Sequence, residues 1–322
     1  MKKIDCHTHA FPWEALEAMQ KYYPELIELH TNDDGSKYAI WAKTPLPAWN
    51  GQKRIDKMDK AEIDIEVIQN PIIYNKLDEN TPDLCRAVNN SLAQACNEFP
   101  ERFKFLVSLP LNDMPETIKE IARAVDELGA SGIVIPSNVN GLYLDNPQFI
   151  PFWEEVARRD LMVFIHPLYS SFYKDDEGPT LLAFPFDTTL SAVKLVLSGF
   201  FEKFKNVKII LSHMGGALPY MARRIDVPFE IPSFLPGYSE RLIKLPSEYM
   251  KNFYLDTSLN WSKSAFNCAK DLVGIEHLVF ASDFFIETTD YDERTIHFIE
   301  SLELSDIEKK MVYSENINEL LK

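Results

Sequence analysis

Residues 161–167 read LMVFIHP, an apolar run closed by a histidine and a proline. A run without polar alternation is typical of a parallel strand covered on both faces, whereas a half-exposed strand alternates apolar and polar residues. The pattern recurs in GIVIP at 132–136, VKIILSH at 207–213 and HLVFASD at 277–283. These stretches therefore predict a buried parallel sheet.

Eight times the chain places a short apolar, β-branched run before a helical stretch. In residues 115–128, for example, apolar residues fall at helical spacing, and Gly129 follows as a helix stop. Alternating strands and helices form right-handed βαβ units. Eight units in 322 residues predict a closed (β/α)8 TIM-like barrel, as one domain over residues 1–322; an open doubly wound sheet is the alternative. The predicted strands are residues 3–9, 63–69, 103–109, 131–136, 161–166, 207–213, 252–257 and 277–282.

Three connections are longer than a barrel needs: residues 10–53, 167–185 and 226–246, all rich in aromatic residues or proline. Each follows a strand, so we expect all three at the C-terminal face, where barrel enzymes build their active sites. Connections of this length in a compact domain are usually lids or binding loops.

The composition limits the possible partners. A hydrophobic share of 46% supports a large core, and the net charge of -16 argues against nucleic acid or an anionic membrane. A small carboxylate substrate stays compatible, since a few local arginines can override a distant acidic surface. Four scattered cysteines, no signal-peptide pattern and no long apolar span predict a reduced, cytoplasmic protein without membrane contact.

The most informative local pattern is DCHTH at residues 5–9. Alternate side chains of a strand lie on the same face, so His7 and His9 can bind one metal ion together. We then expect Ile4, Cys6 and Thr8 to face the helices.

Other polar residues also end predicted strands. His166 ends the fifth run, His213 ends the sixth and Asp283 ends the eighth. Four of the seven histidines thus lie where strand ends converge over one cavity, which a core or surface histidine has no reason to do. The remaining three, which we take as structural or exposed, are His30, His277 and His297.

Neutral imidazoles with one carboxylate suit Zn²⁺, and they also accept Fe, Co or Mn. Three or four protein ligands leave a position for water or substrate, as in catalytic rather than structural sites. Such a metal lowers the pKa of its water to roughly 7. Asp283 could serve as a ligand, as a proton acceptor or as both.

Two arginines are candidate carboxylate anchors, because the guanidinium fork matches a carboxylate. Arg54 precedes the second strand, and Arg224 lies in the helix after His213. An exposed helix arginine is the alternative for each. The sequence MGG at residues 214–216 predicts a tight strand-to-helix turn.

Several segments resemble the amidohydrolase-related family, in the branch that holds aminocarboxymuconate-semialdehyde decarboxylase and γ-resorcylate decarboxylase. They include DCHTH, RIDKMDKAEIDIEVIQNP, KIILSHMGGALPYMARRID and LVFASDFF, and the resemblance runs in order over nearly the whole chain. It implies a (β/α)8 barrel with a single metal, zinc being our expectation. The residues that it implies as ligands are His7, His9, His166 and Asp283.

The same resemblance assigns further roles. It implies that His213 is an acid–base group beside the metal rather than a main ligand, and that Arg54 contacts a substrate carboxylate. We expect His213 and Asp283 together to move protons in catalysis. Arg224 would come from a neighbouring subunit, which implies a homodimer. The opening HxH matches the semialdehyde decarboxylase, and GIVIPSN lacks the lysine that bridges two metals in binuclear relatives. The connections after the first, fifth and sixth strands depart from the family, so the substrate stays open.

We therefore expect a metal-dependent carboxy-lyase that decarboxylates a small unsaturated or aromatic carboxylic acid without oxidation. The alternative is a metal-dependent hydrolase or hydratase of a small cyclic ester, amide or enoic acid, because the same metal site serves both. A non-catalytic metal-binding or scaffolding protein is disfavoured, since a barrel core needs no convergent polar cluster at its mouth.

Overall fold

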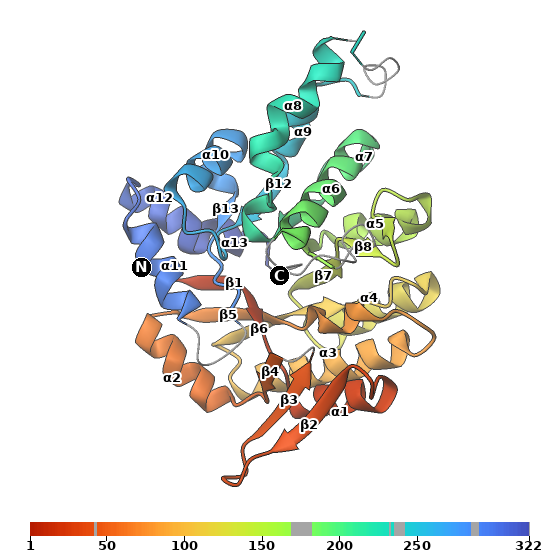
Figure 1. The fold of residues 1–322 in the computed structure, drawn as a ribbon, viewed down its shortest axis with the longest axis vertical. Coiled ribbons are helices and arrows are strands. Elements are labelled where there is room, and N and C mark those ends of the chain that lie inside the picture. Colours follow the sequence, from red (N-terminus) through yellow and green to blue (C-terminus); the bar gives the residue numbers. More distant parts are fainter. Residues whose placement is uncertain (42–43, 169–181, 232, 235–241, 285–289, 322) are drawn as a thin grey trace.

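The structure, a computed structural model, describes residues 1–41, 44–168, 182–231, 233–234, 242–284 and 290–321 (Figure 1). Eight parallel strands form a ring. Their order around the ring is their order along the chain, and neighbouring strands are hydrogen-bonded. They are β1 (Ile4–His9), β5 (Ile65–Gln69), β6 (Phe103–Ser108), β7 (Gly132–Pro136), β10 (Met162–His166), β11 (Lys208–Leu211), β12 (Phe253–Asp256) and β13 (Leu278–Val279).

Hydrogen bonds close the ring between its first and last strands. The backbone N–H of Cys6 donates to Phe280 O at 3.0 Å, and that of His9 donates to Phe284 O at 2.8 Å. Asp283 N–H donates in return to His7 O at 2.9 Å. The predicted closed barrel is confirmed, and the open sheet is excluded.

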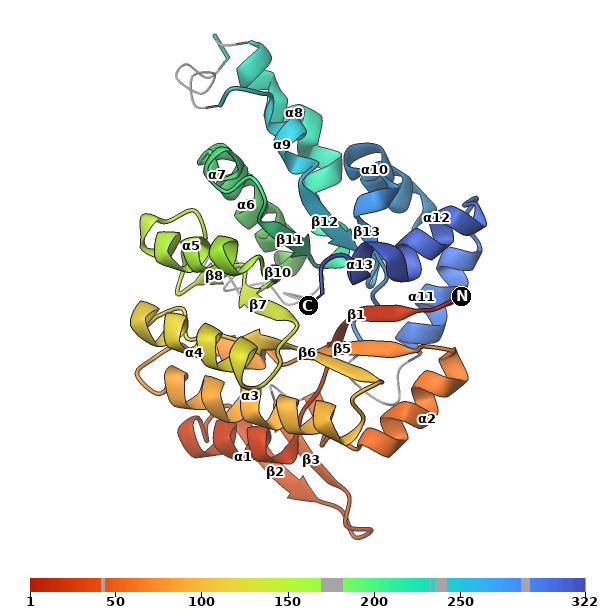
Figure 2. The same cartoon turned by 180° about the vertical axis from the view of Figure 1, so that it is seen from behind.

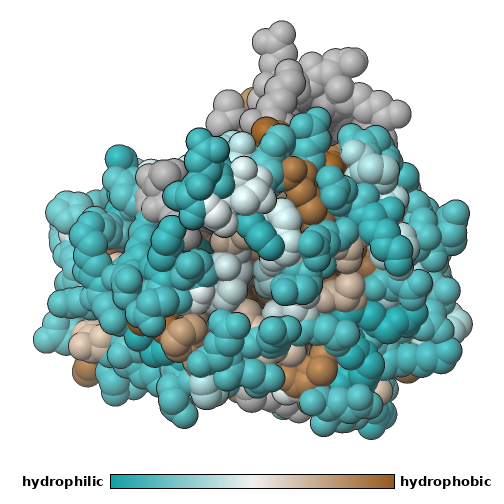
Figure 3. Space-filling model, turned by 90° about the horizontal axis from the view of Figure 1, so that it is seen from below, coloured by the Kyte–Doolittle hydropathy of each residue, from teal (hydrophilic) through white to brown (hydrophobic). Residues whose placement is uncertain are grey.

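Helices surround the strands, as the two opposite views show (Figures 1 and 2). The predicted helix over 115–128 is α4, and the Asp113 side chain caps it by accepting from the Glu116 N–H at 3.1 Å. The outer surface seen from below is mostly hydrophilic (Figure 3). The helices are α1 (Trp13–Tyr22), α2 (Gly51–Ala61), α3 (Thr81–Glu98), α4 (Met114–Asp126), α5 (Ile150–Arg159), α6 (Ala183–Leu197), α7 (Phe200–Lys203), α8 (Leu218–Glu230), α9 (Pro246–Met250), α10 (Lys263–Val273), α11 (Tyr291–Glu300), α12 (Asp306–Lys310) and α13 (Asn316–Asn318).

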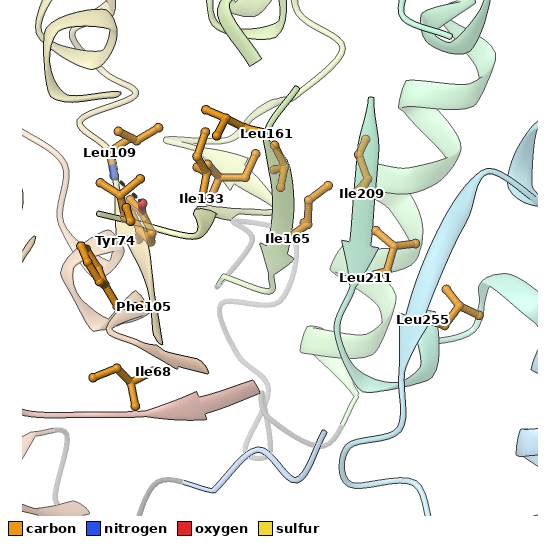
Figure 4. Packing of buried hydrophobic residues seen from close by; sticks show 14 of the residues in the cluster. Ile68, Tyr74, Phe105, Leu109, Ile133, Leu161, Ile165, Ile209, Leu211 and Leu255 are labelled. Atoms are coloured by element: carbon orange, nitrogen blue, oxygen red, sulfur yellow. Dashed lines mark hydrogen bonds between the residues drawn. The ribbon is translucent and has the colours of Figure 1, made fainter. Parts of the chain in front are cut away.

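The barrel wall separates two apolar clusters. The outer cluster packs the strands against the helices and includes Ile133, Ile165 and Ile209 from neighbouring strands (Figure 4). The inner cluster takes side chains from strands all around the ring, and Ile317 and Leu320 near the C-terminus join it. These two residues fill the barrel from the end opposite the histidines, so the interior is a packed core rather than a pore.

Strand β1 departs from strict alternation. Ile4 and Cys6 belong to the inner cluster, so the prediction that they face the helices is wrong. The pairing of β1 with β5 shifts register between Asp5 and Thr8. Such a bulge re-aims side chains, and here it lets Cys6 point inward below His7.

The first long connection is folded rather than a plain loop. After α1 it forms an antiparallel sheet of β2 (Ile27–Thr31), β3 (Lys37–Trp41) and β4 (Thr44–Pro47), and α2 begins at Gly51. A two-stranded hairpin of β8 (Asn138–Val139) and β9 (Leu142–Tyr143) follows β7.

The other two long connections lie partly outside the described residues, which leave out 169–181, 232 and 235–241. The segment predicted as a loop from residue 226 begins as helix instead, because α8 continues to Glu230 with Pro228 inside it. None of the described helices combines the length and apolar character that crossing a membrane requires.

Candidate metal centre

Five polar side chains meet at the mouth of the barrel. One ligand atom each of His7, His166, His213 and Asp283 lie within 4.8 Å of one another. His9 adjoins them, with Nε2 2.8 Å from Asp283 Oδ1. The structure thus brings together every residue that the sequence placed here. The remaining histidines lie on β2, on the 3-10 turn Ile275–His277 and on α11.

Asp283 is the carboxylate at the middle of this cluster. Its Oδ1 lies 3.1 Å from His7 Nε2, and its Oδ2 lies 3.4 Å from His213 Nε2. Burial alone would raise the pKa of Asp283, but the charge of His7 and the hydrogen bonds of the histidines hold it well below its usual value. Asp283 is therefore ionised.

The surroundings shift the pKa values of the histidines in opposite directions. Burial, together with the neighbouring imidazoles, lowers the pKa of His166 well below its usual value, and burial also lowers that of His9. For His7, burial would lower the pKa, but the charge of Asp283 and hydrogen bonds to Asp256 and Asp283 raise it to about 10. A lowered pKa favours the neutral imidazole, which is the form that binds a cation beside a carboxylate.

The backbone is strained at the same place. His213, Met214 and Asp283 have φ of 54°, 58° and 59°, in the left-handed region that costs a non-glycine residue of order 1 kcal/mol or more. Gly216 has φ +63°, and a Cβ there would overlap the carbonyl oxygen of Pro185. The predicted tight turn over 214–216 is thus confirmed, and it presents His213 to the cavity.

A cavity of about 650 Å³ opens over the cluster. His9, His166, His213 and Asp283 line its polar part. Its apolar part comes mainly from the long connections, as we expected, and includes Phe11, Trp41, Leu46, Leu168 and Phe184. A polar base under apolar and aromatic walls suits a small flat molecule with a charged group.

Arg54 is buried, with 6% exposure, so it is not an exposed helix arginine. Its Nε donates to Glu66 Oε2 at 2.6 Å, and its guanidinium lies 3.9 Å from the Phe284 ring centroid. Its Nη2 is buried and has no hydrogen-bond partner among the described residues. Arg54 and His9 border a small side cavity of about 20 Å³.

Arg224 lies elsewhere. It is exposed on α8, and it is not among the described residues that line the main cavity. Within one chain, the structure does not bring Arg224 to the histidine cluster.

The family described as Amidohydrolase matches residues 4–322 of the chain. This chain belongs to the amidohydrolase family. It is 30% identical over 295 residues to the 2-amino-3-carboxymuconate-6-semialdehyde decarboxylase of Dictyostelium discoideum, covering 88% of this chain and 81% of that protein. It is 32% identical over 228 residues to the γ-resorcylate decarboxylase of Rhizobium sp., covering 65% of this chain and 68% of that protein.

Solved structures agree with the family. The 5-carboxyvanillate decarboxylase of Sphingomonas paucimobilis superposes with a TM-score of 0.84 at 25% identity, covering 99% of this amidohydrolase and 98% of that chain. The dihydroxybenzoic acid decarboxylase of Polaromonas sp., which has bound manganese and the inhibitor 2-nitroresorcinol, superposes with a TM-score of 0.79 at 26% identity, covering 99% and 96%.

The residues of this amidohydrolase fit a divalent metal. Bonds of about 2.1 Å to one ion place two ligand atoms at most about 4.2 Å apart. The ligand atoms of His7, His166, His213 and Asp283 all lie within 4.8 Å of one another, so they need only a small contraction to share an ion. His9 Nε2 reaches the same place, since it lies 2.8 Å from Asp283 Oδ1. His7 Nε2 is buried and lies 3.1 Å from Asp283 Oδ1, the carboxylate oxygen that also contacts His9 Nε2 at 2.8 Å. A buried ring nitrogen beside a carboxylate oxygen offers two ligand atoms to one metal ion.

One further residue belongs to this site and was not predicted from the sequence. Asp256 is fully buried, and its Oδ2 lies 2.8 Å from His7 Nδ1. Asp256 ends β12, in the run predicted over residues 252–257. The rule that singled out His166 and Asp283, a polar residue at a strand's C-terminal end, would also have found it.

Proposed function

We propose that this amidohydrolase is a metal-dependent, non-oxidative decarboxylase of a small unsaturated or aromatic carboxylic acid. The observation that carries the proposal is the cluster of histidines around Asp283 at the base of an aromatic cavity. Relatives that match most of the chain are decarboxylases of such acids, which favours this chemistry over hydrolysis.

In this proposal His7, His9, His166 and Asp283 hold one divalent ion, and His213 stays outside the ligand set. When bound, the ion supplies positive charge that holds and polarises substrate oxygens. Zinc is the metal that we expect. Manganese is the first alternative, because the Polaromonas relative binds it.

Decarboxylation replaces a carboxylate with a proton. The carbon–carbon bond breaks, CO₂ leaves, and the electron pair stays on the substrate carbon, which then takes a proton. We assign the delivery of this proton to His213, whose side chain is nearly buried but lines the cavity and lies 3.4 Å from Asp283 Oδ2. Such proton transfer typically contributes about 10²–10⁴-fold to the rate.

Arg54 is proposed to anchor a substrate carboxylate. Glu66 engages its Nε, which fixes the guanidinium plane, while Nη2 has no hydrogen-bond partner among the described residues, and Arg54 borders the small cavity beside His9. A buried charged donor without an acceptor is costly, and a carboxylate oxygen would satisfy it.

Arg224 is proposed to act in the neighbouring subunit of a homodimer. Helix α8 projects from the barrel (Figure 1), and apolar side chains around it are exposed, including Tyr220 at 83% and Ile243 at 85%. Ile243 lies in the segment before α9, which packs against α8, and exposed apolar side chains on neighbouring elements are typical of interaction surfaces. In the proposed homodimer, a second copy of the chain packs against α8, and Arg224 lines the cavity of that second copy.

The proposal is tested by assaying CO₂ release from 2,6-dihydroxybenzoate, 5-carboxyvanillate and 2-amino-3-carboxymuconate-6-semialdehyde, beside a panel of lactones and cyclic amides. We expect CO₂ from at least one acid, at a rate that the His213→Ala variant lowers by about 10²–10⁴-fold. Turnover of lactones or amides alone would instead establish the hydrolase.

A further inference from the structure

Asp256 is a buried carboxylate that contacts both halves of the site. One half is the proposed metal ligand His7, and the other is the turn that presents His213. Its Oδ2 lies 2.8 Å from His7 Nδ1 on β1. Its Oδ1 accepts from Met214 N–H at 3.3 Å, on the turn after β11, and from Ser258 Oγ–H at 2.9 Å. The residue has no exposed surface, so water does not compete for these contacts.

The contact with His7 decides which ring nitrogen is available to a metal. Because Asp256 engages Nδ1, Nε2 is the ring nitrogen that would bind a metal, and Nε2 is the atom that lies beside Asp283. Carboxylates that orient ligating imidazoles in this way typically change metal affinity by about 10–100-fold.

The contact with Met214 stabilises a strained segment. His213 and Met214 both have left-handed backbone conformations, which persist only when surrounding contacts hold them. The bond from Met214 N–H to Asp256 Oδ1 is such a contact, one residue after His213.

We propose that Asp256 is a positioning residue that couples the two halves of the site. It fixes the ring of the ligand His7 through one oxygen and the turn that presents His213 through the other. The inference rests on the proposed metal site, but it does not depend on the substrate class.

The test is the Asp256→Asn variant, which keeps the side-chain shape. Its amide either donates to His7 Nδ1, which moves the ring proton to Nε2, or turns its NH₂ group toward the N–H of Met214. Both arrangements damage one half of the site. We expect the Kd for Co²⁺ to rise about 10–100-fold, with a changed Co²⁺ absorption spectrum at saturation.

The matched control is Asp226→Asn. Asp226 is also fully buried, but it accepts from Arg223 and Ser247, and no imidazole is among its hydrogen-bond partners in the described part of the chain. We expect its Co²⁺ affinity and spectrum to equal those of the wild type. Should Asp256→Asn fold poorly, Ser258→Ala removes the hydroxyl that lies 2.9 and 3.0 Å from the two Asp256 oxygens and 3.5 Å from His7 Nδ1, and it should raise the Kd several-fold.

The possible outcomes distinguish a failure of the role of Asp256 from a failure of the proposed metal site. A wild-type protein that binds no Co²⁺ overturns the metal site and the role of Asp256 with it. Wild-type binding with an unchanged Kd and spectrum in Asp256→Asn overturns the role of Asp256 alone. Coupling to His213 further predicts that the metal-saturated variant has a lowered kcat and an unchanged KM, and full recovery of kcat would contradict it.

Discussion

Arg54 and Glu66 form an ion pair inside the wall between α2 and β5, with Arg54 Nε 2.6 Å from Glu66 Oε2 and both side chains almost fully buried. Burial raises the pKa of Glu66, although the charge of Arg54 and its hydrogen bond partly oppose this. A pair of this kind fixes the guanidinium plane. Among the described residues Nη2 has no hydrogen-bond partner, and Arg54 borders the small cavity beside His9.

The first prediction concerns this donor. Arg54→Lys keeps the charge but removes the fork, so a lysine cannot bind Glu66 and a substrate carboxylate in the same way. We expect kcat/KM for an acid substrate to fall about 10–100-fold, because a hydrogen bond to a charged group is worth about 1.5–3 kcal/mol. Arg158→Lys, on an exposed arginine paired with Glu155, is the control. Normal turnover in a folded Arg54→Lys protein would remove Arg54 from substrate binding.

The second prediction concerns metal content. A single site on His7, His9, His166 and Asp283 should hold about one divalent ion per chain, measurable by elemental analysis of the purified protein. Treatment with a chelator should abolish activity, and one equivalent of metal should restore it. Two tightly held ions that persist in a His7→Ala variant would rule out the mononuclear site.

The third prediction separates a ligand from an acid–base group. His166→Ala should lose most of the metal, because it deletes a proposed ligand. His213→Ala should keep the metal and lose about 10²–10⁴-fold in kcat. Distances alone do not separate the two roles, because a ring nitrogen of His213 lies within 4.8 Å of the ligand atoms of Asp283 and His166. Equal loss of metal in both variants would make His213 a ligand.

The fourth prediction tests whether subunits share sites. Arg224→Ala and His213→Ala should each be nearly inactive as purified dimers. In a mixture of the two, half of the dimers are mixed, and one of their two sites is intact, so about a quarter of the wild-type activity should return. An active monomer in sedimentation, or a mixture that stays inactive, would place Arg224 outside the catalytic site.

The barrel and its polar mouth could be predicted from the sequence because both depend on local patterns. Continuous apolar runs such as GIVIP mark parallel strands, and parallel strands end at one face. A polar residue at the end of such a run, as in VFIHP or VFASD, therefore lies at the mouth whatever the packing of the helices.

What could not be predicted depends on contacts between distant segments. The inward position of Cys6 follows from a register shift between β1 and β5, which no alternation within one strand reveals. The pairing of Arg54 with Glu66 and the bond of Asp256 to His7 join residues 12 and 249 positions apart. The sequence pattern predicts the strand or helix that carries each of these side chains. The residue that each one contacts depends on tertiary packing.

The most direct test of the proposed reaction is product analysis in D₂O with the best acid substrate. The account predicts one equivalent of CO₂ and a product with one solvent deuteron on the carbon that carried the carboxylate, delivered through His213. The same product should form far more slowly with His213→Ala. A ring-opened or hydrated product that retains every carboxylate would contradict decarboxylation and establish the hydrolase or hydratase.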